Sequence, residues 1–497
     1  MLFQMLKPAL LPLLWVLAIG QARPDPSAII LKAQALADGG QLPQAEQLLE
    51  SALRDSPNNP DLRFSLGMVY LRERNWEIAI ENYQISLKEN PRQVRTLFYL
   101  GEAYFMNSDF ERACASLVEA VKVAPEDAQV RQKYGEYLSS RLASRSEGLR
   151  QLQKARQLDP HLPRVDFDIG KAQFDLTDFR SAAESLESEL KARKDDGEAA
   201  FFLAEAEAKL GNWQKAQTAY EYALAHGNAE APAYYGLGRA RVELEEYSSA
   251  VAPLQKALGL RPSLIEAHFQ LGKAYQRLGR RDEARRETKL FAAMNGRIDT
   301  SQESRGAELE DAWKRVKPLL AANQEMQALE YLAKLPEVDR ANPAHAYYLL
   351  GEMYFSLGRR EDAKRELLAA RDRSPDDPRI AAYLGMVQLA SDQIDAAEQS
   401  LHAALALDAA EPLALIGMGG IRYRQQRWGD AIPYFEHSRT ADPNTLLLLC
   451  DAYFRVGKRE EGLLTAEIVR AFGVDQPTVL DSLHQLLKQY EESKTRP

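Results

Sequence analysis

Residues 60–91 read PDLRFSLGMVYLRERNWEIAIENYQISLKENP, and this stretch decides the fold. Apolar side chains recur at helical spacing both before and after the polar turn at residues 72–75. Pro91 ends the second run, because a proline ring clashes with the preceding helical turn and has no N–H to donate. The stretch therefore predicts two amphipathic helices joined by a short turn.

The same skeleton recurs along the chain. The Leu66–Gly67 pair returns as Leu100–Gly101, and Gly101 follows Gly67 by 34 residues. The small residues of this class lie at Ala33, Gly67, Gly101, Gly135, Gly170, Ala204, Gly238, Gly272, Gly351, Gly385 and Gly419. Glycine inside a helix costs roughly 0.5–1 kcal/mol relative to alanine. Its repetition therefore predicts a close approach of two helices in every unit.

Two irregularities interrupt the period: the first is a variant unit within the array, and only the second divides the predicted domains. The fourth unit has Glu147–Gly148 where the other second helices carry alanine, and a polar stretch at 295–308 lengthens the interval between Gly272 and Gly351. Such a polar stretch is typical of a linker. The predicted domains are 23–298 (an array of about eight units), 299–308 (a linker), 309–475 (an array of about five units) and 476–497 (a capping helix and tail).

The repeated unit resembles the tetratricopeptide repeat, whose 34-residue pattern carries an aromatic residue, Leu-Gly, Tyr, Ala, a second aromatic, Ala and Pro in this order. The resemblance covers about thirteen units over residues 26–475. It implies an all-α fold, a right-handed superhelical solenoid of antiparallel helix pairs. In this family the first helices line a concave groove.

Composition narrows the function classes. The chain has 497 residues and a formal net charge of −9, whereas general nucleic-acid binding needs a dominant basic surface. The two cysteines, Cys114 and Cys450, cannot form a disulfide framework, and both are predicted to be small buried residues.

The N-terminal segment has the features of a secretory signal. Lys7 precedes the apolar run 9–19, and small residues follow at 20–22. We expect residues 1–22 to be a cleaved signal peptide and the protein to be exported, either periplasmic or secreted. The alternative is an uncleaved N-terminal membrane anchor.

No motif predicts catalysis. The glycine-rich run 417–420 falls at the repeat's own glycine position and follows no strand, so it does not match a phosphate loop. The histidines are scattered without metal-ligand spacing, and no GxSxG motif occurs. We expect no enzyme activity, no cofactor and no metal. An enzyme hidden in the array is the remaining alternative, and no long non-repeat segment supports it.

An aromatic residue occupies the fifth position of many units, counted so that Pro60 is the first residue of its unit. These residues are Phe64, Phe98, Phe167, Phe201, Tyr235, Phe269 and Tyr348. The resemblance places this position on the concave face, so one hypothesis is a ladder of anchors for a bound peptide. The alternative is packing between neighbouring hairpins. The chain lacks the lysine-and-asparagine clamp with which some tetratricopeptide cochaperones hold a C-terminal carboxylate.

One basic cluster lies at the end of the eighth unit. Its core is Arg280, Arg281, Arg285, Arg286 and Lys289. One interpretation is a docking patch for an acidic partner, and the other is a solvated helix face neutralised by neighbouring acids.

Together these features predict a non-catalytic scaffold that binds protein or peptide partners through the concave groove. The alternative is a structural component of an envelope export or assembly machine, handling polysaccharide or outer-membrane protein. Fold alone does not distinguish the two.

Overall fold

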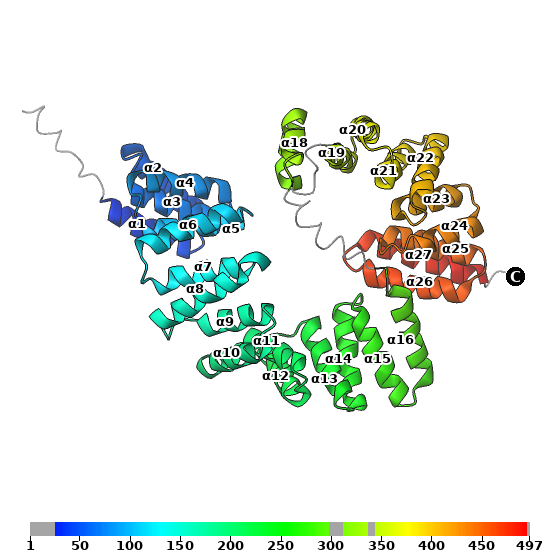
Figure 1. Cartoon of the computed structure of the whole chain (residues 1–497), viewed down its shortest axis with the longest axis horizontal. Coiled ribbons are helices and arrows are strands. Elements are labelled where there is room, and N and C mark those ends of the chain that lie inside the picture. Colours follow the sequence, from blue (N-terminus) through cyan, green and yellow to red (C-terminus); the bar gives the residue numbers. More distant parts are fainter. Residues whose placement is uncertain (1–24, 298–311, 336–342, 495–497) are drawn as a thin grey trace, which may run out of the picture. The chain divides into compact units, whose positions relative to one another are not determined.

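The computed structural model describes residues 25–297, 312–335 and 343–494, and all regular structure assigned there is helical (Figure 1). The predicted signal segment 1–22 and the predicted linker 299–308 lie outside the described residues. Contacts divide the chain after Asp195 into two compact parts, which we term unit 1 and unit 2. The predicted all-α array of helix pairs is confirmed in both.

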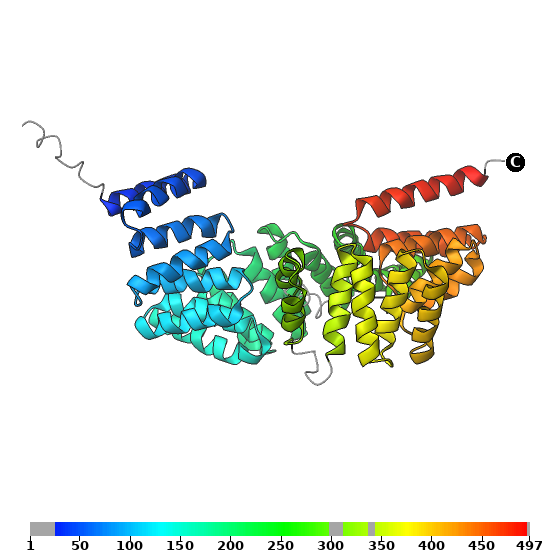
Figure 2. The same cartoon turned by 90° about the horizontal axis from the view of Figure 1, so that it is seen from above.

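Unit 1 consists of successive helical hairpins that are layered in chain order (Figure 2). A short 3₁₀ turn, Leu142–Ser144, precedes the second helix of the fourth hairpin. The helices are α1 (Pro26–Asp38), α2 (Leu42–Asp55), α3 (Pro60–Arg72), α4 (Trp76–Glu89), α5 (Val94–Met106), α6 (Phe110–Val123), α7 (Ala128–Ser139), α8 (Arg145–Leu158), α9 (Val165–Asp175) and α10 (Phe179–Ala192).

Unit 2 continues the pattern on both sides of residues 298–311. Before these residues it contains three hairpins, formed by α11 (Gly197–Lys209) and α12 (Trp213–Ala225), α13 (Ala231–Glu243) and α14 (Tyr247–Leu260), and α15 (Ile265–Arg277) and α16 (Arg281–Met294). Residues 312–321 are helical and precede α18 (Glu325–Leu332). Then follow α19 (Ala344–Ser356), α20 (Arg360–Arg373), α21 (Pro378–Ala390), α22 (Ile394–Leu407), α23 (Pro412–Arg424), α24 (Trp428–His437), α25 (Pro443–Arg455), α26 (Arg459–Phe472) and α27 (Pro477–Lys494).

The small residue of the first helix lets the second helix of its hairpin come close. A Cβ atom added at Gly238 would lie 2.5 Å from Leu254 Cγ, and one added at Gly351 would lie 2.7 Å from Leu367 Cγ. Both distances are shorter than van der Waals contact, so the predicted close approach is confirmed at these positions. Gly272 differs, because a Cβ there would meet its nearest atom at 3.5 Å.

Tyrosine hydroxyls connect successive hairpins. Tyr70 on α3 donates a hydrogen bond to Glu46 on α2 at 2.6 Å. Tyr275 on α15 accepts one from Gln255 on α14 at 2.9 Å. Each bond joins a first helix to the second helix of the preceding hairpin, which fixes the hairpin-to-hairpin register.

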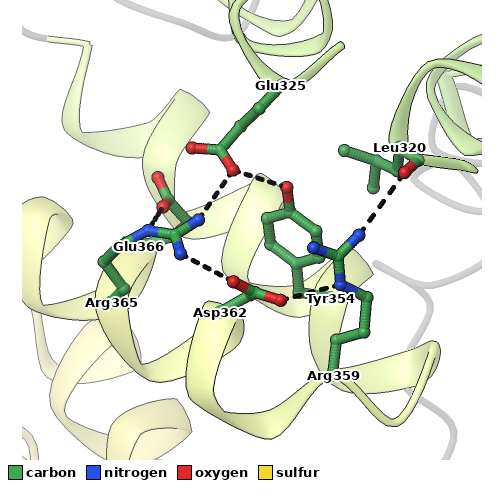
Figure 3. A network of polar contacts seen from close by, with 7 residues as sticks. All are labelled: Leu320, Glu325, Tyr354, Arg359, Asp362, Arg365 and Glu366. Carbon is green, nitrogen blue, oxygen red and sulfur yellow. Dashed lines mark hydrogen bonds and ion pairs between the residues drawn. The ribbon is translucent and has the colours of Figure 1, made fainter. Parts of the chain in front are cut away.

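The short pair formed by residues 312–321 and α18 is held to the next hairpin by a polar network (Figure 3). Arg365 on α20 contacts the carboxylates of Glu325 at 2.7 Å, Asp362 at 2.6 Å and Glu366 at 2.7 Å. Tyr354 on α19 donates to the same Glu325 carboxylate at 2.7 Å. The network therefore joins the first residue of α18 to both α19 and α20.

In unit 2, α16 packs against α26, far along the chain (Figure 1). Leu290 and Met294 of α16 share one buried apolar cluster with Ile468 and Val469 of α26. Leu483 of α27 belongs to the same cluster. The repeat period does not predict this contact, since the period specifies only neighbouring hairpins.

Candidate binding groove

One hollow in unit 1 is formed mainly by three successive first helices, α1, α3 and α5, with Leu49 of α2. It has a volume of about 160 Å³. Its apolar lining comes from Ile30, Ala33, Ala37, Leu49, Met68 and Val69, its aromatic lining from Phe64 and Tyr99, and its polar lining from Gln34, Ser65, Arg72 and Arg95. The stacking of hairpins places these side chains together, because each hairpin contributes one first helix to the same face.

Aromatic rings form one wall of the hollow. The centroid of the Phe64 ring lies 5.7 Å from that of Tyr99 and 5.8 Å from that of Tyr83, which comes from the second helix α4. The Arg95 guanidinium lies over the Phe64 ring, 4.0 Å from its centroid. Such a cation–π contact holds the charged group at the rim of the hollow.

The two arginines of the hollow differ in their partners. Arg72 forms an ion pair with Asp38 of α1 at 2.8 Å. Arg95 is exposed and forms no ion pair with any residue that the structure describes. The uncompensated positive charge at this site is therefore that of Arg95.

The structure places the seven predicted aromatic residues on first helices, but at different depths. Phe64 and Phe167 are buried, with 3% and 4% of their surface exposed, whereas Phe269 is 50% exposed. The remaining four are half-buried: Phe98, Phe201, Tyr235 and Tyr348. Phe64 alone among the seven lines the hollow described above.

A recurring arginine covers some of these rings. Arg164 lies 4.0 Å from the centroid of Phe167, and Arg379 lies 5.9 Å from that of Tyr348. Arg379 also forms an ion pair with Asp377 at 2.7 Å. Arg379 follows Tyr348 by the same interval as Arg95 follows Phe64, whereas Arg164 is the N-cap residue of the helix that carries Phe167.

The predicted basic patch lies on α16 and its N-cap, and part of it contacts the chain itself. Arg286 forms an ion pair with Glu467 of α26, and Lys289 lies 3.5 Å from Glu460. Arg280 pairs with Glu283 in the next turn at 2.8 Å. Arg281 and Arg285 are exposed.

Potential metal ligands do not cluster among the described residues, and burial raises the thiol pKa of both cysteines. In the described part of the chain, no group of three or more His, Cys, Asp or Glu side chains could hold a metal ion. Cys450 is buried, and burial raises the pKa of its thiol to about 12, so it stays protonated at neutral pH. Burial also raises the pKa of the half-buried Cys114. Within the same ranges, no helix is both long enough and apolar enough to cross a bilayer.

Sequence reasoning did not identify Met68, Tyr83, Arg95 or Tyr99 as members of a site. One signal was available. Charged residues directly follow the repeat's small residue at Glu102, Glu136, Lys171, Glu205, Arg239, Lys273 and Glu352. Gln34 and Met68, which both line the hollow, are uncharged at this position, but so are Met386 and Gly420, so the signal does not point to the hollow alone.

Family models match much of the chain. Models described as tetratricopeptide repeat match residues 30–77, 65–129, 167–216, 344–377 and 383–444, and one described as TPR repeat matches residues 238–279. These matches fall in both units and agree with the helical hairpins seen there.

Individual relatives are distant. The chain is 22% identical over 195 residues to a DnaJ homolog subfamily C member 7 homolog from Dictyostelium discoideum, a match that covers 36% of each chain. It is 32% identical over 131 residues to cellulose synthase operon protein C from Komagataeibacter xylinus, covering 26% of this chain and 9% of that protein. The match thus spans about a third or less of either relative. A crystal structure of a tetratricopeptide repeat protein from Parabacteroides merdae aligns at 17% identity and a TM-score of 0.40, covering 51% of this chain and 99% of that one.

Proposed function

Because this chain belongs to the tetratricopeptide repeat family, we propose that it is a non-catalytic scaffold that binds a protein or peptide partner through its first helices. The observation that carries the proposal is the hollow of α1, α3 and α5, to which three successive hairpins contribute side chains. A peptide that places one side chain in this hollow can contact all three helices at once.

The size of the hollow favours a side chain over a small molecule. Its volume is about 160 Å³, whereas pockets for cofactors and small ligands measure roughly 300–1,000 Å³. One large apolar side chain fills such a space, and the remainder of a peptide would then lie along the exposed faces of α3 and α5.

A second candidate function is a structural part of an envelope export or assembly machine. Two observations favour it: the predicted signal segment 1–22, and the local similarity to cellulose synthase operon protein C. Under this proposal the protein is exported, either periplasmic or secreted, and the hollow contacts another component of the machine. The ligand is then a polysaccharide or an outer-membrane protein.

A site-specific cross-link tests the main proposal. A photo-reactive benzoylphenylalanine is placed at Ser65, which lines the hollow, or at the exposed Glu81 on the second helix α4 as the matched control. We expect a discrete cross-linked polypeptide from position 65 in native cells and none from position 81. Identical products from both positions, or none from either, would contradict the proposal. A carbohydrate-containing product from position 65 would favour the second candidate instead.

A further inference from the structure

The hydroxyl group of Tyr83 is buried without a hydrogen-bond partner. Tyr83 lies on α4, its side chain has no exposed surface, and its hydroxyl contacts no donor or acceptor among the described residues. Burial raises the pKa of this hydroxyl well above its ordinary value, so it is a protonated donor at all physiological pH values. An unsatisfied buried donor costs stability, so its presence calls for an explanation.

A tyrosine at the matching position of another hairpin has the hydrogen-bond acceptor that Tyr83 lacks. Tyr220 occupies the same repeat position on α12, and its hydroxyl donates to Glu205 at 2.5 Å. Glu205 directly follows Ala204 on α11, just as Met68 directly follows Gly67 on α3. In the α3–α4 hairpin the donor is therefore present, but the position of the acceptor is occupied by Met68, which lines the hollow.

Arg95, at the rim of the hollow, likewise has no carboxylate partner among the described residues. Arg379 stands above Tyr348 as Arg95 stands above Phe64, and Arg379 is paired with Asp377. The residue two positions before Arg95 is the neutral Gln93. Arg95 thus lines the hollow, and Tyr83 lies behind it, packed against the lining ring of Phe64. Within the part of the chain that the structure describes, neither donor has the carboxylate partner that its counterpart in unit 2 possesses.

We propose that this hollow binds an acidic peptide segment in which a carboxylate side chain lies next to one large apolar side chain. The proposal rests on the proposed scaffold function and specifies its ligand. The apolar side chain occupies the space lined by Ile30, Ala37 and Val69. The carboxylate accepts hydrogen bonds from the Arg95 guanidinium and, after the flexible Met68 side chain turns aside, from the Tyr83 hydroxyl.

The probe is a displayed library of random decapeptides, selected on the full chain and then resynthesised with a fluorescent label. We expect the selected sequences to be enriched in Asp or Glu beside Leu, Met or Phe. Arg95→Gln should weaken binding of these peptides about tenfold, since it removes a charge-assisted bond. Arg92→Gln is the matched control, because it removes an equal charge from an exposed site outside the hollow. This variant should not weaken binding of the peptides.

Three further variants separate binding from folding. Tyr83→Phe removes only the unsatisfied hydroxyl, so it should weaken binding several-fold without lowering the melting temperature. Met68→Glu supplies the internal acceptor found at Glu205, so it should abolish binding of acidic peptides while the fold is retained. Met68→Leu keeps the site apolar and should preserve binding.

Three results would overturn the inference. Selected peptides without acidic enrichment, equal binding by the Arg95→Gln and Arg92→Gln variants, or undiminished binding by Met68→Glu would each refute the acidic ligand while leaving the scaffold function intact. A failure to select any peptide on the full chain would count against both the inference and the proposed function. Replacing the acid in a selected peptide with its amide, or amidating the peptide's C-terminus instead, identifies which carboxylate is bound.

Discussion

The Arg286 guanidinium of α16 forms an ion pair with the Glu467 carboxylate of α26, and 181 residues separate the two in the chain. The pair is solvent-exposed, and pairs of this kind contribute roughly 0–1 kcal/mol. The same two helices also share an apolar cluster, with Leu290 and Met294 on one side and Val469 on the other, and all three side chains are buried. Burial of such a side chain contributes roughly 1.5–3 kcal/mol. The hydrophobic contact therefore stabilises this helix pair, and the ion pair mainly fixes its orientation.

The first prediction concerns Met294, which has no exposed surface. Met294→Ala removes buried contacts at the α16–α26 interface and should lower the free energy of unfolding by about 2–5 kcal/mol. Urea denaturation followed by circular dichroism measures this change. Arg286→Ala should cost less than about 1 kcal/mol. The exposed Met326 provides the control, since Met326→Ala should have almost no effect.

Amide hydrogen exchange gives a second readout for the same prediction. Exchange in α26 should accelerate in Met294→Ala, because the loosened interface exposes this helix. If the two methionine variants are equally stable and exchange in α26 is unchanged, the assigned role of the α16–α26 contact is wrong.

The second prediction concerns the repeat glycines. Gly238→Ala should destabilise the protein by about 1–3 kcal/mol, because the new Cβ would meet the Leu254 side chain at 2.5 Å. Gly272 is the matched control in the next first helix, where the nearest atom would be 3.5 Å away. Gly272→Ala should be neutral or stabilise by up to about 1 kcal/mol through helix propensity. Equal melting temperatures of the two variants would contradict the packing role of glycine.

The hairpins could be predicted from the sequence because their determinants are local and repeat. Each Leu-Gly pair and its partner alanine lie within one period, so a regular spacing reports directly on one packed unit. The α16–α26 contact could not be predicted in this way. Its residues are far apart, and no periodic signal links Met294 to Val469.

The candidate site was predicted only in part. The fifth-position rule identified Phe64 as a groove residue, and Phe64 does line the hollow. The rule could not rank the positions by depth, because burial depends on the neighbouring hairpin: Phe64 is buried and Phe269 is half exposed. The unpaired donors Tyr83 and Arg95 stand out only when their counterparts in unit 2 are compared in three dimensions.

The third prediction concerns Arg365, which contacts three carboxylates in the network of Figure 3. Arg365→Met removes the cation and leaves Glu366, of which only 4% is exposed, without its partner. Because Arg365 itself is half exposed, we expect a loss of about 1–2 kcal/mol rather than the larger cost of a fully buried pair.

The readout for Arg365→Met is amide exchange in α18, which the network joins to α20. Exchange there should increase in the variant. Arg371→Met is the control, since Arg371 lies on the exposed surface of the same helix. Equal exchange in the two variants would show that α18 is held by its apolar contacts alone.

The fourth prediction is a pH dependence that originates at Asp168 on α9. Burial is the main cause that raises the pKa of this carboxyl to about 6, with a smaller contribution from Glu136. The hydrogen bond from Gln132 and the charges of Arg164 and Lys133 act in the opposite direction. In the unfolded chain an aspartate has a pKa of about 3.9. The folded state therefore holds this proton more tightly than the unfolded state does.

The sign of the effect follows from this difference. The contribution of Asp168 to stability is complete below about pH 4 and is lost as the pH rises to about 6, where the folded protein must ionise a half-buried acid. Asp168→Asn carries no ionisable group, so it should match the parent near pH 4 and be more stable by about 1–2 kcal/mol at pH 8. The exposed Asp195 supplies the control, since Asp195→Asn should follow the parent at both pH values. The urea midpoints of the three proteins, measured at both pH values, test this prediction. If all three midpoints change equally between the two pH values, the ionisation of Asp168 does not destabilise the folded protein.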